Sequence, residues 1–235
     1  MLKNKKTIGV IGGMGPEATV DFFRWVVHLT TARSDIDHPH LLIDNNPQIP
    51  SRIKAILDHG PSPLPVMLRM AQKLVLSGAK IIVIPCNTAS YFIPSLQKKI
   101  NVPILNIIEE TVFWINNHYP NIKKVGIMAT IPTLKTGLYQ QELIKFKIEP
   151  IVPTLNIVRK LIMSATHGRR GIKSGYHSTP RRKLIKSLKY YRQLGAEAII
   201  LGCTEIPLVL RPKDSSLILI NPTKILAQAV ISRAI

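Results

Sequence analysis

Two cysteines, Cys86 and Cys203, are the residues whose type and placement most strongly suggest chemistry in this sequence. Residues 78–86 read Gly-Ala-Lys-Ile-Ile-Val-Ile-Pro-Cys, and residues 195–203 read Gly-Ala-Glu-Ala-Ile-Ile-Leu-Gly-Cys. In each copy a glycine that can end a helix precedes an apolar strand, and the cysteine stands where the strand ends. Loops beyond the carboxyl ends of strands form the ligand site in open α/β sheets, so both thiols are predicted at such a site.

A matched pair of thiols suits proton removal from an amino-acid α-carbon and proton return on its opposite face. One group must act as the base and the other as the acid. An unperturbed thiol has a pKa of roughly 8.5, and cationic neighbours lower it, so a thiol and a thiolate coexist near neutral pH. Cations and backbone N–H groups would stabilise the carbanion. The alternative is two buried core thiols, which would not be expected to occupy equivalent positions in two repeats.

The elements that must position these thiols alternate between strand and helix. The strand candidates are rich in Ile and Val with little polar alternation, which is typical of parallel strands covered on both faces. They are Thr7–Ile11, His40–Asn45, Lys80–Pro85, Val102–Ile107, Lys124–Ala129, Glu149–Val152, Ala198–Gly202 and Leu217–Ile220. The helix candidates between them are Ala18–Thr31, Pro65–Ser77, Ile108–Asn117, Thr136–Lys145, Pro180–Leu194 and Pro222–Arg233.

This order predicts an α/β fold of two similar parallel-sheet domains, related by pseudo-symmetry, with an active-site cleft between them. The chain has 235 residues and 46% hydrophobic content, which suffices for two small cores. We predict a first lobe of residues 1–118 plus about 213–235, which carries Cys86. The second lobe, residues 119–212, carries Cys203.

Four motifs, in order along nearly the whole chain, together resemble the aspartate/glutamate racemase family, and its aspartate racemases most. They are Ile11-Gly-Gly-Met-Gly-Pro-Glu-Ala-Thr19, Asn46-Pro-Gln-Ile-Pro-Ser-Arg52, Pro85-Cys-Asn-Thr-Ala89 and Gly202-Cys-Thr-Glu205. The resemblance implies the two-domain fold, an active-site cleft, no cofactor, and the two cysteines as proton donor and acceptor. No residues suggest a metal site.

The resemblance also implies substrate-binding residues. It assigns Arg52 to a substrate carboxylate, which suits a guanidinium fork. It expects a second carboxylate-binding lysine some thirty residues before the second cysteine, and Lys173 lies at that spacing. The other expected substrate contacts are Met14, Asn87, Thr88, Ala89, Thr130, Thr133 and Thr204. Ser90 and Pro132 depart from the residues that relatives usually have, a histidine and a glycine, and put substrate preference and rate in question.

The favoured function is therefore cofactor-independent racemisation of an acidic amino acid, most simply L-aspartate to D-aspartate. A glutamate or broad-specificity racemase of the same family is the alternative, and a hydantoin racemase or maleate isomerase is a more distant one. No segment resembles a membrane span or signal peptide, so we expect a cytoplasmic protein. Relatives suggest a homodimer.

A racemase-fold protein that binds anions or nucleic acid is a further alternative, because the net charge is +19. No acidic residue occurs between Glu149 and Glu197, whereas the stretch 159–192 is rich in lysine and arginine. Such a stretch attracts anions of many kinds, and we expect it to bind them without specificity. The chain has no recognisable nucleic-acid motif.

Overall fold

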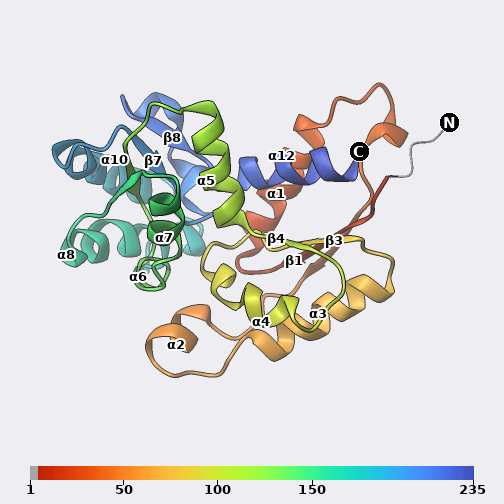
Figure 1. Ribbon diagram of the computed structural model, residues 1–235. Helices are drawn as coiled ribbons and strands as arrows, with labels where there is room; N and C mark the ends of the chain where they lie inside the picture. The colour runs from red at the N-terminus through yellow and green to blue at the C-terminus, as the bar shows by residue number, and fades with distance from the viewer. Residues whose placement is uncertain (1–4) are drawn as a thin grey trace. The chain divides into compact units, whose positions relative to one another are not determined.

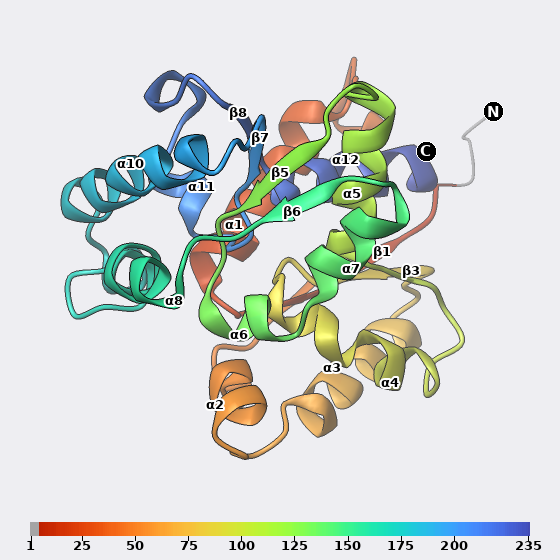
Figure 2. The same ribbon diagram turned by 60° about the vertical axis from the view of Figure 1, so that its left-hand side comes forward.

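A computed structural model describes residues 5–235 and divides them into two compact units. Unit 1 comprises the chain up to Glu110 together with Thr223–Ile235, and unit 2 comprises Thr111–Pro222. The ribbon is drawn in two views in Figures 1 and 2. None of the helices found in residues 5–235 has the length and apolar character needed to cross a membrane.

Unit 1 is built on one parallel sheet of four short strands with helices around it. In Figure 1, α3 and α4 lie on one side of β1 and β3, and α1 and α12 lie on the other. The strands are β1 (Ile8–Gly12), β2 (Leu41–Asn45), β3 (Ile81–Val83) and β4 (Ile104–Leu105). The helices are α1 (Pro16–Leu29), η1 (Asp35–Asp37), α2 (Arg52–Leu57), α3 (Leu64–Leu76), η2 (Thr88–Phe92), α4 (Ile93–Gln97) and α12 (Pro222–Ala234).

Unit 2 repeats this plan, and α5 (Ile107–His118) leads into it from unit 1. Its strands are β5 (Lys124–Ile127), β6 (Glu149–Ile151), β7 (Ala198–Ile200) and β8 (Ile218–Ile220). Its helical segments are α6 (Ile131–Lys135), α7 (Leu138–Lys145), α8 (Leu155–Ile157), the π-helical η3 (Val158–Met163), α9 (Ser164–Thr166), η4 (Ile172–Ser174), α10 (Ser178–Gln193), α11 (Ile206–Val209) and η5 (Pro212–Asp214).

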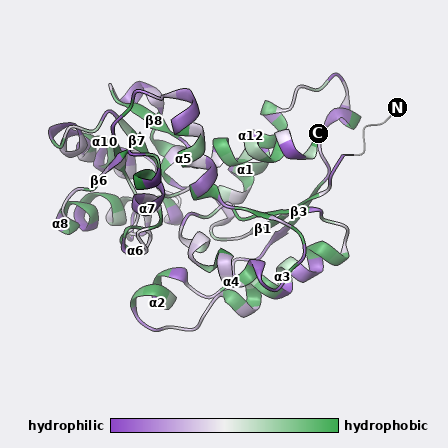
Figure 3. Ribbon diagram, viewed as in Figure 1, coloured by the Kyte–Doolittle hydropathy of each residue, from purple (hydrophilic) through white to green (hydrophobic). Residues whose placement is uncertain are grey.

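The two sheets have the same strand order, which confirms the predicted α/β repeat. The first runs β2-β1-β3-β4 and the second β6-β5-β7-β8, and all six pairings between neighbouring strands are parallel. Strands β1, β3 and β7 are buried along their whole length, as expected for parallel strands covered on both faces. Figure 3 shows β1 and β3 largely in the green of apolar residues.

All eight predicted strands and all six predicted helices are present, with ends that differ by a few residues. The helical segments that were not predicted include α2, α4, α6 and α11, which have four to six residues. A helix that short completes little more than one turn, so it presents no apolar periodicity to recognise. They also include the continuous run of α8, η3 and α9 from Leu155 to Thr166.

The last strand lies in a different unit from the one expected. A first lobe that resumes near residue 213 would contain β8, but β8 pairs with β7 in the second sheet. The chain returns to unit 1 only at Thr223, within α12. Pairing with β7 buries Ile220 and completes a four-stranded sheet, which gives the strand a physical reason to stay in unit 2. At the other boundary, the division falls inside α5, earlier than the predicted residue 118.

The repeated glycines end the helices before β3 and β7 in the same way. Gly78 and Gly195 have φ values of 99° and 81°, in the left-handed region that side chains disfavour. The next N–H in each copy reaches back to the last turn: Ala79 donates to the carbonyl of Leu74, and Ala196 to that of Tyr191. This is the hydrogen-bond pattern of a glycine-terminated helix, and it turns each chain directly into its strand.

Gly13 has far less space around its Cα than Gly78 has. Its φ is 93°, and a Cβ placed on it would lie 2.3 Å from the carbonyl carbon and oxygen of Asn46. The loop after β1 therefore packs directly against the backbone that follows β2. At Gly78 a Cβ would meet nothing within 4 Å.

Alanine substitution at these two glycines should separate backbone strain from steric conflict. Gly78→Ala should lower the free energy of unfolding by about 1–2 kcal/mol, the cost of a left-handed residue with a side chain. Gly13→Ala should cost clearly more, because the Asn46 backbone must also move. Urea unfolding of both variants measures the difference. Equal losses would mean that the contact between the two loops is loose.

Candidate functional site

Three loops carry the predicted residues of unit 1 to one edge of its sheet. Met14 follows β1, Arg52 follows β2, and Cys86 follows β3. Because β1 pairs in parallel with both β2 and β3, the carboxyl ends of the three strands lie side by side. Met14 and Cys86 also belong to the same buried apolar cluster. The loops predicted from separate motifs are thus neighbours in the fold.

Cys86 lies three residues beyond the end of β3, where the chain turns into a 3₁₀ helix. Its carbonyl accepts a hydrogen bond from the Ala89 N–H at 3.2 Å, within the first turn. The side chain of Cys86 is 6% exposed, and Asn87 and Ala89 are buried beside it. Thr88 opens η2 and is half-buried. The motif therefore forms a compact turn in which the thiol is buried.

Arg52 is the first residue of α2, a helix capped by the Ser51 hydroxyl, which accepts from the Lys54 N–H. One guanidinium nitrogen, Nη1, donates to the carbonyls of Ile49 and Pro50 at 3.2 and 3.1 Å. These bonds fix the orientation of the side chain and leave further N–H donors on the guanidinium. No carboxylate within residues 5–235 forms an ion pair with Arg52. Helix α2 also contacts η2, the segment that follows Cys86.

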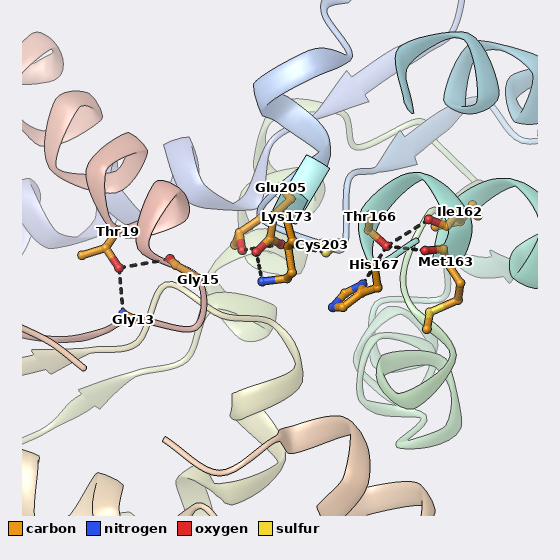
Figure 4. A network of polar contacts seen from close by, with 11 residues as sticks. Gly13, Gly15, Thr19, Ile162, Met163, Thr166, His167, Lys173, Cys203 and Glu205 are labelled. Atoms are coloured by element: carbon orange, nitrogen blue, oxygen red, sulfur yellow. Dashed lines mark hydrogen bonds and ion pairs between the residues drawn. The ribbon is translucent and has the colours of Figure 1, made fainter. Parts of the chain in front are cut away.

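Thr19 holds the glycine-rich loop that carries Met14. Its hydroxyl accepts from the Gly13 N–H at 3.0 Å and donates to the Gly15 carbonyl at 3.3 Å, as Figure 4 shows. Pro16 opens α1 directly after this loop, and Thr19 lies in the first turn of that helix. The threonine therefore fastens the loop to the helix, and Met14, 4% exposed, is packed into the core.

In unit 2, Cys203 lies three residues beyond the end of β7, just as Cys86 does beyond β3. Thr130 ends the neighbouring loop after β5, Thr133 lies in the following helix α6, and their buried hydroxyls are 3.1 Å apart. The two loops adjoin, because a Cβ on Gly202 would lie 2.9 Å from that of Ala129. Pro132 stands in the first turn of α6, where its missing N–H costs no helical hydrogen bond.

Glu205 is the centre of the polar contacts in this unit (Figure 4). Its side chain is 4% exposed. Oε2 accepts from the Cys203 thiol at 2.9 Å and from the Thr204 hydroxyl at 3.3 Å. Oε1 forms an ion pair with Nζ of Lys173, whose side chain is 28% exposed. One carboxylate thus binds the thiol, its neighbouring hydroxyl and a cation.

These contacts set the charge of the thiol. Burial raises the pKa of Cys203 well above its usual range, and the negative charge of Glu205 raises it further, whereas Lys173 opposes the shift. Burial would also raise the pKa of the Glu205 carboxyl, but the charge of Lys173 and the thiol hydrogen bond outweigh it and leave this pKa lowered. At neutral pH Cys203 is therefore a thiol beside a carboxylate.

His167 adds a second basic side chain near the carboxylate. Its positive form would lower the pKa of Glu205 further. Its Nδ1 lies 2.8 Å from the hydroxyl of Thr166, which is buried and donates to the Ile162 carbonyl at 2.9 Å. The histidines are scattered along the sequence, so this position of His167 could not be predicted from it.

The structure thus groups the predicted residues into two sets. Unit 1 holds Met14, Arg52, Cys86, Asn87, Thr88 and Ala89 on adjoining loops. In unit 2, Lys173, Cys203 and Thr204 all contact Glu205, and Thr130 and Thr133 lie at the start of α6, beside the Cys203 loop. Glu205 was not among the predicted site residues, although it closes the Gly202–Glu205 motif. Its position directly after Cys203 and Thr204 was the available signal.

Comparisons with known proteins agree on one family. The family model of Asp/Glu/hydantoin racemases matches residues 11–230. A broad-specificity amino-acid racemase of Bacillus subtilis (strain 168) is 30% identical over 96% of both chains. A glutamate racemase of Corynebacterium glutamicum is 31% identical over 83% of this chain and 69% of its own length.

A solved structure gives the same answer at the level of the fold. The aspartate racemase of Picrophilus torridus superposes with a TM-score of 0.85 at 29% identity, covering 97% of this chain and 94% of its own. The span of the family model, residues 11–230, includes both cysteine motifs and every strand except the start of β1. The chain belongs to the Asp/Glu/hydantoin racemase family, and its activity is that of an amino-acid racemase.

Proposed function

We propose that this racemase interconverts L- and D-aspartate without a cofactor, and that Cys86 and Cys203 serve opposite faces of the substrate α-carbon. The observation that carries the proposal is the equivalence of the two thiols. Each lies three residues beyond the end of the corresponding strand in sheets of identical order. A reaction that runs in both directions needs two groups of the same kind on opposite faces of the carbon.

In the resting protein Cys203 is the proton donor of the pair. Its raised pKa keeps the proton on sulfur, and Glu205 accepts the S–H hydrogen bond. In one direction the thiolate of Cys86 removes the α-proton, and Cys203 then delivers its own proton to the other face. In the reverse direction the thiolate of Cys203 takes the α-proton. Each turnover leaves the donor as a thiolate and the acceptor as a thiol.

Glu205 and Lys173 position Cys203 and adjust its proton affinity. After Cys203 gives up its proton, a thiolate stands beside the Glu205 carboxylate, and the charge of Lys173 offsets this repulsion. Burial and the neighbouring carboxylate keep the proton on Cys203 until it is delivered, whereas the nearby ammonium stabilises the thiolate that remains afterwards. The proposed roles follow from the opposite signs of these two charges.

Arg52 would bind one carboxylate of the substrate. Two fixed bonds to backbone carbonyls hold its guanidinium, and its remaining donors suit a carboxylate fork. Lys173 would bind the second carboxylate. An ammonium has three N–H donors, so the ion pair with Glu205 is compatible with a substrate contact. Thr130 and Thr133 offer hydroxyls on the loop beside Cys203.

A broad-specificity racemase is the second candidate. The Bacillus subtilis relative with that name matches over nearly the full length of both chains. The side-chain carboxylate of the substrate distinguishes the two candidates, because only an acidic substrate needs two cations.

Alanine at either cysteine should abolish racemisation, because neither thiol can serve both faces of the carbon. We expect a loss of at least about a hundredfold for Cys86→Ala and for Cys203→Ala, the scale of a lost general acid or base. Circular dichroism of aspartate solutions follows the interconversion. In deuterated water each variant should still exchange the α-proton of one enantiomer, and the two variants should prefer opposite enantiomers. Wild-type racemisation by either variant would contradict the two-base mechanism.

Charge changes at Glu205 and Lys173 should move the pKa of Cys203 in opposite directions. In a Cys86→Ala background, Glu205→Gln removes a negative charge and should lower this pKa. Lys173→Gln removes a positive charge and should raise it further. The pH dependence of thiol alkylation by iodoacetamide reports both shifts, with Lys160→Gln as an exposed control of equal charge change. Shifts of the same sign would mean that the variants only disturb packing.

Arg52 variants and a substrate panel should reveal how the substrate is recognised. Arg52→Ala should cost more than Arg52→Lys, because lysine keeps the charge but loses the fork. Aspartate should be preferred over glutamate by the equivalent of about 1–3 kcal/mol, the usual cost of one misplaced methylene. Rates on aspartate, glutamate and alanine measure this preference. Equal rates on alanine would favour the broad-specificity candidate.

A further inference from the structure

Unit 2 contains a basic pocket that the racemase chemistry does not use. Its volume is about 540 Å³. One wall is the start of α10, with His177, Ser178, Arg181 and Arg182, and the other consists of Leu208, Val209, Arg211 and Lys213. Helices α10 and α11 contact each other and lie side by side in Figure 2.

The lining is strongly positive. It includes three arginines and a lysine, and none of the eight lining residues is acidic. Ser178 is the first residue of a sixteen-residue helix, so the partial positive charge of the helix N-terminus adds to the side-chain charges. Arg182 and Arg211 are exposed and belong to opposite walls. An anion between them would meet donors on both sides.

Asp214 connects the two walls of the pocket and neutralises the charge of Arg181. Its side chain is 3% exposed, and both of its oxygens accept from the guanidinium of Arg181, Oδ2 from Nε at 3.1 Å. Oδ2 also accepts from the Arg211 N–H at 2.9 Å. The ion pair ties α10 to η5 and holds the two walls together. Arg182, Arg211 and Lys213 remain as positive charges beyond the one that Asp214 balances.

We propose that this pocket binds a small molecule that carries two or more phosphate groups. Arginine forks and helix N-termini are the groups that proteins use to bind phosphate. The volume exceeds the space of a single phosphate ion and falls within the range of about 300–1,000 Å³ of small-molecule sites. Leu208 and Val209 give the pocket an apolar side, which suits the organic part of a nucleotide.

The pocket is distinct from the residues around Cys203. Its lining includes neither Cys203, Glu205 nor Lys173. Glu205 directly precedes the four-residue α11, and Leu208 and Val209 end it, so the pocket lining begins one helical turn beyond Glu205. The pocket and the Cys203 cluster therefore share no side chain.

Isothermal titration of the intact protein with sodium tripolyphosphate, and in parallel with a nucleoside triphosphate, tests the proposal. Both probes should bind saturably with one site per chain. The double variant Arg182→Gln/Arg211→Gln should weaken both at least about tenfold. Tighter binding of the nucleoside triphosphate would identify the occupant as a nucleotide, and equal binding would identify it as a free polyphosphate. Thermal unfolding checks that the variants are folded.

The matched control is Arg159→Gln/Arg169→Gln, which removes two exposed arginines of the same unit that do not line the pocket. It should bind both probes within about twofold of the parent protein. Equal weakening in the two double variants would mean diffuse attraction by the basic stretch and would overturn the pocket. Binding of an oligonucleotide without saturable binding of either small probe would also overturn it. Displacement of tripolyphosphate by excess L-aspartate would assign the phosphate to the substrate site instead.

Discussion

Parallel strand pairing is the constraint on which the rest of this structure depends. In a parallel sheet every strand ends at the same edge, so loops that are far apart in sequence emerge together. In unit 1 this brings the loops of Met14, Arg52 and Cys86 together, and in unit 2 it brings the Thr130 loop to the Cys203 loop. Because the two sheets share one strand order, each cysteine has the same place in its own unit.

Burial and a neighbouring carboxylate then set the protonation state of Cys203. Taking a charge out of water is costly, so Glu205 remains ionised only because Lys173 and the surrounding hydrogen bonds compensate for its burial. Burial raises the pKa of Cys203, and the same carboxylate raises it further, so the proton stays on sulfur. The thiol and the carboxylate are thus coupled, and the cation that stabilises one also limits the pKa shift of the other.

The basic side chains of this protein have different surroundings in the fold. Within the basic stretch, Arg181 is held by Asp214, and Arg192 donates to the hydroxyl of Ser216. Other cations lie on the exposed face of α10, whose opposite face packs Leu184, Leu188 and Tyr191 into the core. The pocket forms where the first turns of this helix meet residues 208–213, which lie outside the basic stretch. Proximity in the fold, rather than charge density along the chain, defines it.

The sequence by itself determined the repeat, the eight strands and the placement of both cysteines at strand ends. These follow from local signals, namely apolar runs and the glycines that end helices before them. Its motifs also pointed to the family to which the chain belongs. Helices of four to six residues escaped prediction because they complete little more than one turn.

Only the tertiary structure decided which charges meet. Lys173 in η4 pairs with Glu205, which follows β7, and nothing in the residues around Lys173 encodes that contact. The membership of β8 was likewise settled by its pairing with β7, since an apolar strand can complete either sheet. A burial pattern follows from the order of apolar and polar residues within one short segment. An ion pair or a strand partner depends on which distant residues the whole fold brings together.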